Sequence, residues 1–318
     1  MSAETTCRFR PPSTGRQVTW EITRFCNLFC DHCCTTSGPD VDRSAEPSTQ
    51  VLIAAAAELA DARVEKVQFS GGEPLLRDGF LDMLDAIDTT RVRVHLASNG
   101  YRLTDQILDH LVRVGLAKLS VSVDGGIAAH HDLIRRKKGA FERTMSGIGR
   151  AVEAGLHVGV SATVTPGNIS SLETLVEHLA GLGVSDLSIH SVVSVGRATI
   201  HPELLFAASQ AQILEQEVRR LDLAYGDQIA FDYSFGFDGE RNLRGCPARE
   251  RLLHIDPLGN VSPCSWLYKI DPARFTLGNL TDGSLRAIAD GYCEALDRLR
   301  ATDPERCIIP LAQLEAAV

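Results

Sequence analysis

Apolar and polar residues follow two alternating rhythms between residue 17 and about residue 192. Short runs rich in β-branched residues predict six strands, at residues 17–23, 64–70, 91–98, 118–124, 158–164 and 187–193. Longer stretches with apolar residues at helical spacing predict helices at residues 49–62, 105–115, 141–155 and 170–183. Three of these helices end in a glycine, the usual residue of a left-handed cap. Six βα units in succession predict a parallel sheet with helices on its outer side, as an open, partial (β/α)6 TIM-like barrel.

The rhythm changes after residue 193. The pattern there predicts a helix, a strand, a hairpin with its turn at residues 257–260, and a closing helix, at residues 209–224, 228–235, 252–264 and 284–300. This order favours a second, smaller α+β unit. We therefore predict an N-terminal extension, a core domain and a C-terminal domain, at residues 1–16, 17–234 and 235–318.

Composition and charge exclude several classes of protein. The chain has 318 residues, of which 44% are hydrophobic and 23% charged, as is typical of a soluble globular protein. No apolar run reaches the length of about 18 residues that a membrane helix needs, and the polar start lacks a secretory segment, so we expect a cytoplasmic protein without a membrane partner. A formal net charge of −9, with cations clustered only at residues 135–138, argues against a nucleic-acid partner.

Nine cysteines are distributed in two groups. Five lie within the first 34 residues and four lie between Cys246 and Cys307. Because the cytosol keeps thiols reduced, cysteines in such a chain are more often metal ligands or catalytic groups than disulfides. Two sites are therefore predicted.

The first site is predicted at Cys26, Cys30 and Cys33, which are spaced as CxxxCxxC. Sulfur-only ligation suits an iron–sulfur cluster, zinc or copper(I). A structural zinc would need a fourth ligand, for which Cys34 or His32 can be proposed. With three ligands, one metal position stays open to a substrate or cofactor.

Polar motifs follow three further strands of the predicted sheet. These are the GGEP sequence of residues 71–74, the SNG sequence of residues 98–100, and the segment that contains Ser122 and Asp124. Because the carboxyl ends of parallel strands meet at one edge, we expect these residues to lie near the cysteines. Glycines also let a backbone approach a ligand closely.

Together these motifs resemble the radical SAM superfamily over most of the chain. The resemblance implies that the three cysteines bind a [4Fe–4S] cluster whose unligated iron chelates S-adenosylmethionine. His32 then occupies the aromatic position near the adenine, and Arg135 is the candidate for the methionine carboxylate. The remaining residues implied to contact the cofactor are Gly71, Gly72, Glu73, Pro74, Ser98, Asn99, Ser122 and Asp124.

Structural alternatives exist for each of these residues. The three cysteines can form a zinc ribbon, and Glu73 can be a carboxylate at a helix N-terminus. The serines, Asn99 and Asp124 can be turn formers, and His32 can pack within the loop. Cys34 is more often a small buried hydrophobic residue than a ligand.

The second group of cysteines resembles the SPASM and twitch extensions of the same superfamily. Cys246, Gly259 and Cys264 match the opening hairpin, the LGNL sequence of residues 277–280 matches its continuation, and Cys307 falls where a later ligand is expected. The chain lacks the seven cysteines of a full SPASM unit, so the resemblance implies one auxiliary [4Fe–4S] cluster. Its fourth ligand is Cys293, a non-cysteine group, or an open position, and a structural zinc hairpin is the alternative.

The resemblance also implies a reaction. An electron from a donor such as a flavodoxin or a ferredoxin cleaves S-adenosylmethionine, and the resulting 5′-deoxyadenosyl radical takes a hydrogen atom from the substrate. The auxiliary cluster then accepts an electron or binds the substrate. An epimerase would need a thiol as hydrogen donor, for which Cys293 and Cys34 are candidates. An iron–sulfur scaffold or sensor would explain the cysteines but not the GGEP motif.

Two substrate classes fit this reaction. One is a small polar metabolite of the aminosugar or nucleoside type, which undergoes dehydrogenation, epimerisation or decarboxylation in a biosynthetic pathway. The other is a ribosomally made precursor peptide, since residues 194–198 resemble a segment of peptide-modifying relatives. Because only about sixteen residues precede the first strand, we expect no N-terminal peptide-recognition domain, although a separate recognition protein could replace it, and we favour the small molecule.

Overall fold

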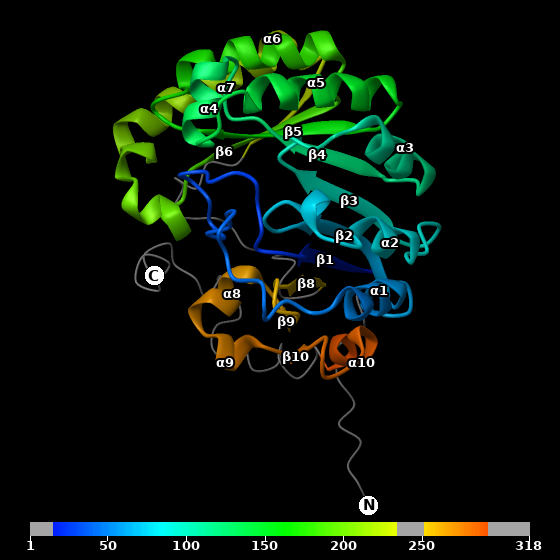
Figure 1. The fold of residues 1–318 in the computed structure, drawn as a ribbon. Coiled ribbons are helices and arrows are strands. Elements are labelled where there is room, and N and C mark those ends of the chain that lie inside the picture. Colours follow the sequence, from blue (N-terminus) through cyan, green and yellow to red (C-terminus); the bar gives the residue numbers. More distant parts are fainter. Residues whose placement is uncertain (1–14, 234–250, 292–318) are drawn as a thin grey trace, which may run out of the picture.

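A computed structural model describes residues 15–233 and 251–291. The described strands form one ten-stranded sheet in the order β10-β9-β8-β1-β2-β3-β4-β5-β6-β7 (Figure 1). The strands are β1 Arg16–Glu21, β2 Val64–Ser70, β3 Arg93–Ser98, β4 Lys118–Ser122, β5 Val158–Val164, β6 Asp186–Ser191, β7 Ala230–Tyr233, β8 Leu252–Ile255, β9 Asn260–Ser262 and β10 Gly278–Asn279.

Strands β1 to β7 pair in parallel and in chain order. All six strands predicted between residues 17 and 193 are present, with shifts of at most two residues at their ends. The sheet curves, and the helices that connect its strands lie on its outer side (Figure 1). The predicted open, partial barrel is confirmed.

The predicted hairpin at residues 252–264 is also present, as β8 and β9. It joins the sheet directly, because β8 pairs in parallel with β1 from Gln17 to Trp20. The C-terminal hairpin therefore extends the core sheet beyond β1. The predicted division between the domains, at residues 234 and 235, lies outside the described residues.

Helices cover the outer face of the sheet. They are α1 Thr49–Ala57, α2 Phe80–Asp85, α3 Asp105–Arg113, α4 Ala128–Ile134, α5 Ala140–Glu153, α6 Leu172–Leu182 and α7 Ala208–Tyr225, and the C-terminal part adds α8 Ser265–Ile270, α9 Pro272–Phe275 and α10 Leu285–Asp290. Gly115, Gly155 and Gly183 follow three of them with φ values of +71°, +81° and +77°, which confirms the predicted left-handed caps. The short helices α2, α4, α8 and α9 were not predicted, because four to seven residues give too little periodicity.

The core lies between the outer face of the sheet and these helices. Trp20 and Phe69 have no exposed surface, and their rings contact each other with centroids 5.6 Å apart and planes tilted by 38°. The ring of Phe80 from α2 meets Phe69 edge-on at 5.5 Å. Because side chains alternate along a strand, the residues between these buried positions point to the opposite, inner face. That face is largely polar, and it leads to the candidate site.

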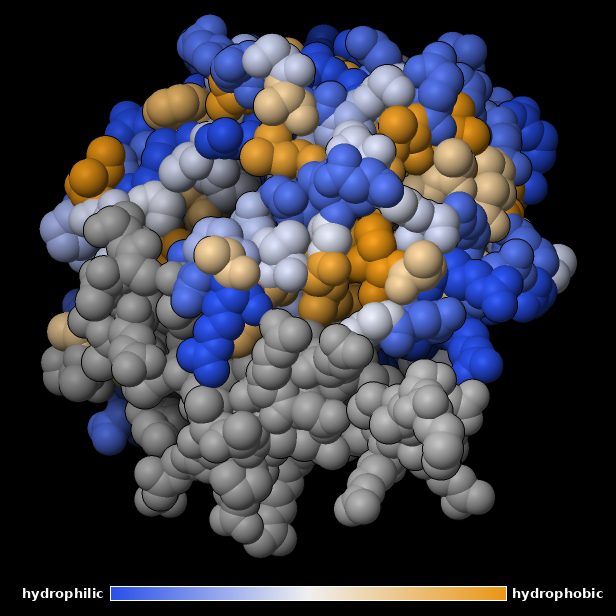
Figure 2. Space-filling model, turned by 90° about the horizontal axis from the view of Figure 1, so that it is seen from below, coloured by the Kyte–Doolittle hydropathy of each residue, from blue (hydrophilic) through white to orange (hydrophobic). Residues whose placement is uncertain are grey.

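The face of the molecule that carries α9, β10 and α10 is mostly hydrophilic where its residues are described (Figure 2). Viewed from the side of α9, β10 and α10, hydrophobic residues form small, separated groups among hydrophilic ones (Figure 2). Among the described helices, none combines the length and the apolar character needed to cross a membrane.

The buried aromatic contact predicts a large effect of truncation. Phe69→Ala should lower the free energy of unfolding by about 3–5 kcal/mol, because it removes the ring that links Trp20 to Phe80 and leaves a cavity. Denaturant unfolding measures this change. Leu223→Ala is the control, since Leu223 is 91% exposed and its truncation should change stability by less than about 0.5 kcal/mol. Equal effects of the two substitutions would contradict the packing described.

Candidate functional site

The loop that follows β1 carries the first group of cysteines. Cys26 is buried, and its Sγ accepts hydrogen bonds from the backbone N–H of Leu28 at 3.4 Å and from Asn99 Nδ2 at 3.7 Å. Cys30 and Cys33 are half-buried, and the N–H of Cys33 donates to the carbonyl of Cys30 at 3.3 Å. Within the described ranges, no three Cys, His, Asp or Glu side chains converge tightly enough to hold a single metal ion.

The start of this loop is fixed by Glu46, whose side chain is almost entirely buried. Its carboxylate accepts hydrogen bonds from Thr23 Oγ1 at 2.9 Å and from the N–H of Arg24 at 2.7 Å. Arg43 at 3.3 Å and Arg77 at 3.9 Å balance its charge. Nothing in the sequence near Glu46 marked it as part of the site, because its partners Thr23, Arg24 and Arg77 lie more than twenty positions away along the chain.

The middle of the loop is attached to the end of α4. The N–H of Asp31 donates to the carbonyl of Ile134 at 2.9 Å, and the Asp31 carboxylate accepts from Arg136 Nε at 2.8 Å. His201 lies 3.5 Å from the same carboxylate. Asp31 therefore connects the loop between Cys30 and Cys33 to two distant segments.

The segment after β6 holds the other side of the loop. The backbone N–H of Arg197 donates to the carbonyl of Cys33 at 3.0 Å, and its Nε donates to the carbonyl of Cys30 at 2.8 Å. Its guanidinium also lies 4.1 Å from the ring centre of Phe29. Gly196 has φ +63°, and a Cβ there would lie 2.4 Å from the carbonyl of Cys33. This close approach to the cysteine loop requires glycine at position 196. Together with the contacts of Arg197, it gives a structural reason for two residues of the segment 194–198.

The GGEP motif packs against the start of the cysteine loop. Gly71 has φ +124°, and a Cβ on Gly72 would lie 2.0 Å from the carbonyl of Phe25. The N–H of Gly72 donates to Thr23 at 2.7 Å and that of Glu73 donates to Phe25 at 2.8 Å. The close approach that these two glycines allow is therefore to residues 23–25, at the start of the cysteine loop. Pro74 begins the short 3-10 helix η1, Pro74–Leu76.

Glu73 is completely buried and joins the ends of two strands. Its Oε1 accepts from Ser98 Oγ at 2.8 Å and from the N–H of Leu75 at 3.2 Å, and its Oε2 accepts from the N–H of Asn99 at 2.7 Å. Burial raises the pKa of Glu73 although these hydrogen bonds oppose the shift. Asn99 in turn contacts Cys26, so Glu73 fixes the strand end that touches the cysteine loop.

Asp124 is the centre of a second buried group. Its carboxylate accepts from Nε and from a terminal nitrogen of Arg135, both at 2.8 Å, and from the N–H of Thr163 at 3.0 Å. His32 Nε2 lies 3.4 Å from it. Burial opposes ionisation of Asp124, but Arg135, His32 and His131 outweigh it and lower its pKa.

The other predicted residues make fewer hydrogen bonds and ion pairs. His32 Nδ1 is buried and has no hydrogen-bond partner among the described residues. Ser122 is half-buried at the end of β4, paired with Ser161 of β5. Cys34 is exposed, and its carbonyl accepts from Lys269 Nζ at 3.3 Å. The structure thus brings the three cysteines, Glu73, Ser98, Asn99, Asp124, Arg135 and His32 to one edge of the sheet.

Cys264 is the described member of the second cysteine group. It is half-buried and precedes α8, directly after the hairpin β8–β9. Cys246, Cys293 and Cys307 lie outside the described residues.

The chemistry of the cysteine loop fits an iron–sulfur cluster. The pKa of Cys26 is raised to about 11 and that of Cys30 to about 12, and burial is the largest cause of both shifts. Thiols bind metals as thiolates, so bound cations must compensate the burial of the two charges. A loop that offers three sulfur donors, with Cys33 as the third, matches the thiolate ligation of such clusters.

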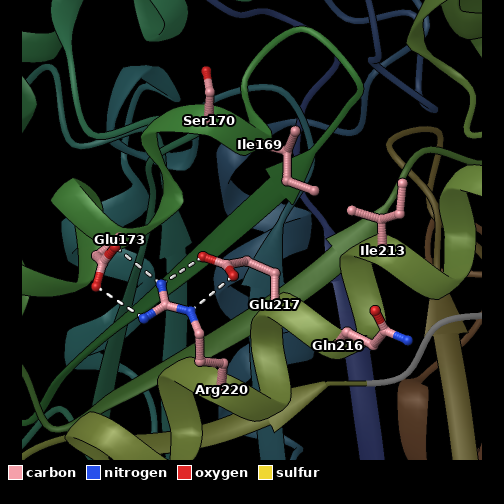
Figure 3. A pocket seen from close by; sticks show the side chains of 7 residues that line it. All are labelled: Ile169, Ser170, Glu173, Ile213, Gln216, Glu217 and Arg220. Carbon is pink, nitrogen blue, oxygen red and sulfur yellow. Dashed lines mark hydrogen bonds and ion pairs between the residues drawn. The ribbon is translucent and has the colours of Figure 1, made fainter.

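A groove elsewhere on the molecule has different properties. It has a volume of about 490 Å³, and it is lined by residues of the 3-10 helix η2, Ile169–Ser171, and of α6 and α7 on the outer helical layer (Figure 3). Arg220 bonds to Glu217 at 2.7 Å and to Glu173 at 2.9 Å, so its charge is already balanced (Figure 3). The groove includes none of the predicted site residues.

Two family models match the chain. One, described as the radical SAM superfamily, matches residues 20–180. The other, described as an iron–sulfur cluster-binding domain (SPASM), matches residues 246–308.

Curated relatives of this chain have different activities. An AdoMet-dependent heme synthase of Nitratidesulfovibrio vulgaris is 27% identical over 277 residues, which cover 80% of this chain and 74% of that protein. The mycofactocin maturase MftC of Mycolicibacterium smegmatis is 30% identical over 280 residues, which cover 85% of this chain and 69% of that protein.

Among solved structures, Streptococcus suis SuiB bound to S-adenosylmethionine has the same fold. Its TM-score is 0.71 at 15% identity, and the match covers 87% of this chain and 65% of that one. At this identity the similarity concerns the fold alone.

The contacts of Arg197 predict a role in holding the cysteine loop. Arg197→Ala should lower the iron retained per chain and speed hydrogen exchange of the amides of residues 29–36 in the metal-free protein. The reason is that it removes a charged hydrogen bond that contributes about 1.5–3 kcal/mol. Iron analysis and exchange mass spectrometry measure both effects. Arg219→Ala, which removes an exposed partner of Glu215, should change neither, and equal exchange in the two variants would refute the role.

Proposed function

Because the chain belongs to the radical SAM superfamily, we propose that Cys26, Cys30 and Cys33 hold a [4Fe–4S] cluster at which S-adenosylmethionine is cleaved reductively. When bound, these groups supply a 5′-deoxyadenosyl radical that takes a hydrogen atom from the substrate. The observation that carries the proposal is the contact between the cysteine loop and the buried strand ends. Asn99 donates to Cys26 with its side chain and to Glu73 with its backbone.

The chain's own residues orient the cofactor in this proposal. A carboxylate has about four acceptor sites, and Glu73 uses three of them on protein donors, which leaves one for the methionine ammonium. Arg135 has five N–H donors and spends two on Asp124, so it retains donors for the methionine carboxylate. Ser98, Asn99, Ser122 and Asp124 are assigned to the ribose and the carboxylate, and His32 is assigned to the adenine.

For the substrate we favour a small polar metabolite of the aminosugar or nucleoside type. The inner face of the sheet supports this, because small polar side chains occupy it where β4, β5 and β6 end. Register pairs Ser122 with Ser161 and Thr163 with His190 on that face. Such a surface offers hydrogen bonds to hydroxyl and amino groups. Dehydrogenation, epimerisation or decarboxylation are the candidate outcomes.

A precursor peptide is the second candidate substrate. The observation that favours it is the 30% identity to the mycofactocin maturase MftC over 85% of this chain. The sporulation killing factor maturation protein SkfB of Bacillus subtilis is also 30% identical, over 57% of this chain. The heme synthase relative supports the small-molecule alternative, since heme is a small molecule.

We further propose one auxiliary [4Fe–4S] cluster in the C-terminal part. Cys246, Cys264 and Cys307 would hold it, with Cys293 as the candidate for a fourth ligand or, if unligated, for a hydrogen donor. Support comes from the second family match, which spans all four cysteines. The electron donor would be a cytoplasmic flavodoxin or ferredoxin.

Two triple variants test the assignment of the clusters. Replacing Cys26, Cys30 and Cys33 by Ala should remove about half of the iron, since one of two clusters is lost, and abolish formation of 5′-deoxyadenosine. Replacing Cys246, Cys264 and Cys307 by Ala should also lower the iron but spare at least part of the cleavage while blocking product. Iron analysis and chromatography of the reduced, anaerobic protein measure this. Cleavage by the first variant would refute the main assignment, and unchanged iron in the second would refute the auxiliary cluster.

A fractionation experiment separates the two substrate classes. We expect the low-molecular-mass fraction of a cell extract to raise 5′-deoxyadenosine formation above its rate without substrate, because a bound substrate directs the radical to a productive hydrogen. The peptide fraction should give no such increase. The opposite result would assign the protein to peptide maturation.

A further inference from the structure

Basic side chains gather on the inner face of the sheet near the amino ends of β2, β3 and β4. These three strands lie side by side in Figure 1. Lys66, His95 and Lys118 lie on these neighbouring strands, and register pairs His95 with Lys118 directly. Each is followed along its strand by an apolar residue with no exposed surface. Because alternate side chains face opposite ways, all three point to the inner face. We call these three residues the cationic patch.

The carboxylates near the cationic patch already have partners. Asp186 accepts from Lys118 Nζ at 2.5 Å. Glu65 lies 3.8 Å from Arg93 and 3.6 Å from Arg251. Four cationic side chains, Lys66, Lys118, Arg93 and Arg251, thus share two carboxylates, which leaves an excess of positive charge around His95.

Lys66 lies within this excess of positive charge, and His95 is the neutral imidazole beside it. Among the described residues, neither makes an ion pair or a hydrogen bond, and both are half-buried. Burial, followed by the charge of Arg93, lowers the pKa of Lys66. Burial, followed by the charges of Lys66 and Lys118, lowers the pKa of His95 to about 4. Repulsion of this kind on an inner face is unusual in a chain of net charge −9, and it is typical of a binding site.

We propose that the cationic patch binds an anionic group, a carboxylate or a phosphate, that the substrate carries. This inference rests on the proposed function, because it places the other end of the substrate at the cysteine loop. His95 precedes Ser98 by three residues, which is about 10 Å along a strand. The substrate therefore has its anionic group about 10 Å from the edge where hydrogen abstraction takes place. An anionic derivative of an aminosugar or a nucleoside has this length and chemistry.

Inorganic phosphate is the probe for the site. The holoenzyme, labelled with 15N-histidine, is titrated with phosphate at low and constant ionic strength, and His95 is assigned as the resonance that His95→Gln lacks. We expect a saturable shift of this resonance with a dissociation constant of about 1 mM or less. Lys66→Gln should weaken binding at least tenfold. Arg219→Gln, on the outer surface of α7, is the matched control and should leave the dissociation constant unchanged.

Glucose 6-phosphate tests whether the patch binds an anionic group carried by a substrate or only a free anion. If the inner face admits a substrate, this larger molecule should displace phosphate and shift the same resonance. Binding of phosphate without glucose 6-phosphate would assign the patch to a free anion and overturn the proposal. So would the absence of a saturable shift, or a shift that Lys66→Gln leaves intact.

A parallel measurement separates this inference from the proposed function. Formation of 5′-deoxyadenosine by the unaltered protein tests the function alone. If cleavage occurs and phosphate does not bind, only the cationic patch is refuted. If phosphate binds and no cleavage occurs under reducing, anaerobic conditions, the proposed function fails and the patch loses its role in holding a substrate.

Discussion

A completely buried carboxylate determines how the edge of this sheet is built. A carboxylate without exposed surface needs several hydrogen-bond donors, because an unsatisfied buried charge costs several kcal/mol or more. Glu73 meets this condition only if Ser98 and Asn99 of the next strand end take the positions that they have. Asn99 then reaches Cys26. The requirement of one carboxylate thus fixes two strand ends and one wall of the cysteine loop.

The cysteine loop has little regular structure of its own and is held by segments from across the chain. Glu46 fixes its start, Asp31 ties its middle to Arg136, and Arg197 binds its carbonyls from the segment after β6. Metal ligands must be placed to within a fraction of an ångström, and loops alone rarely achieve this. Four separate attachments, including the glycine pair of GGEP, explain how a loop can position three thiols.

The two faces of the sheet have different roles. The outer face carries the apolar core, where Trp20, Phe69 and Phe80 pack together. The inner face carries polar side chains from the cationic patch at its amino end to Asp124 and Arg135 at its carboxyl end. The positive charge of Lys66, unpaired among the described residues, therefore lies at one end of this surface and the Asp124–Arg135 ion pair at the other, in a chain that is acidic as a whole.

The sequence by itself determined the strands, the glycine caps and the edge at which the chemistry lies. These follow from local periodicity and from motifs a few residues long, such as CxxxCxxC and GGEP, which need no knowledge of distant neighbours. Arg135 was expected as a cofactor ligand, but its pairing with Asp124 emerged only in the fold. Glu46 and Lys66 gave no usable signal, since a single charged residue looks the same on a solvated surface and in a buried network. Arg197 lies in the segment of residues 194–198 that the sequence singled out, but its contact with the cysteine loop emerged only in the fold. Tertiary structure also decided that β8 pairs with β1, because strand pairing across more than two hundred residues depends on which edge is left unpaired.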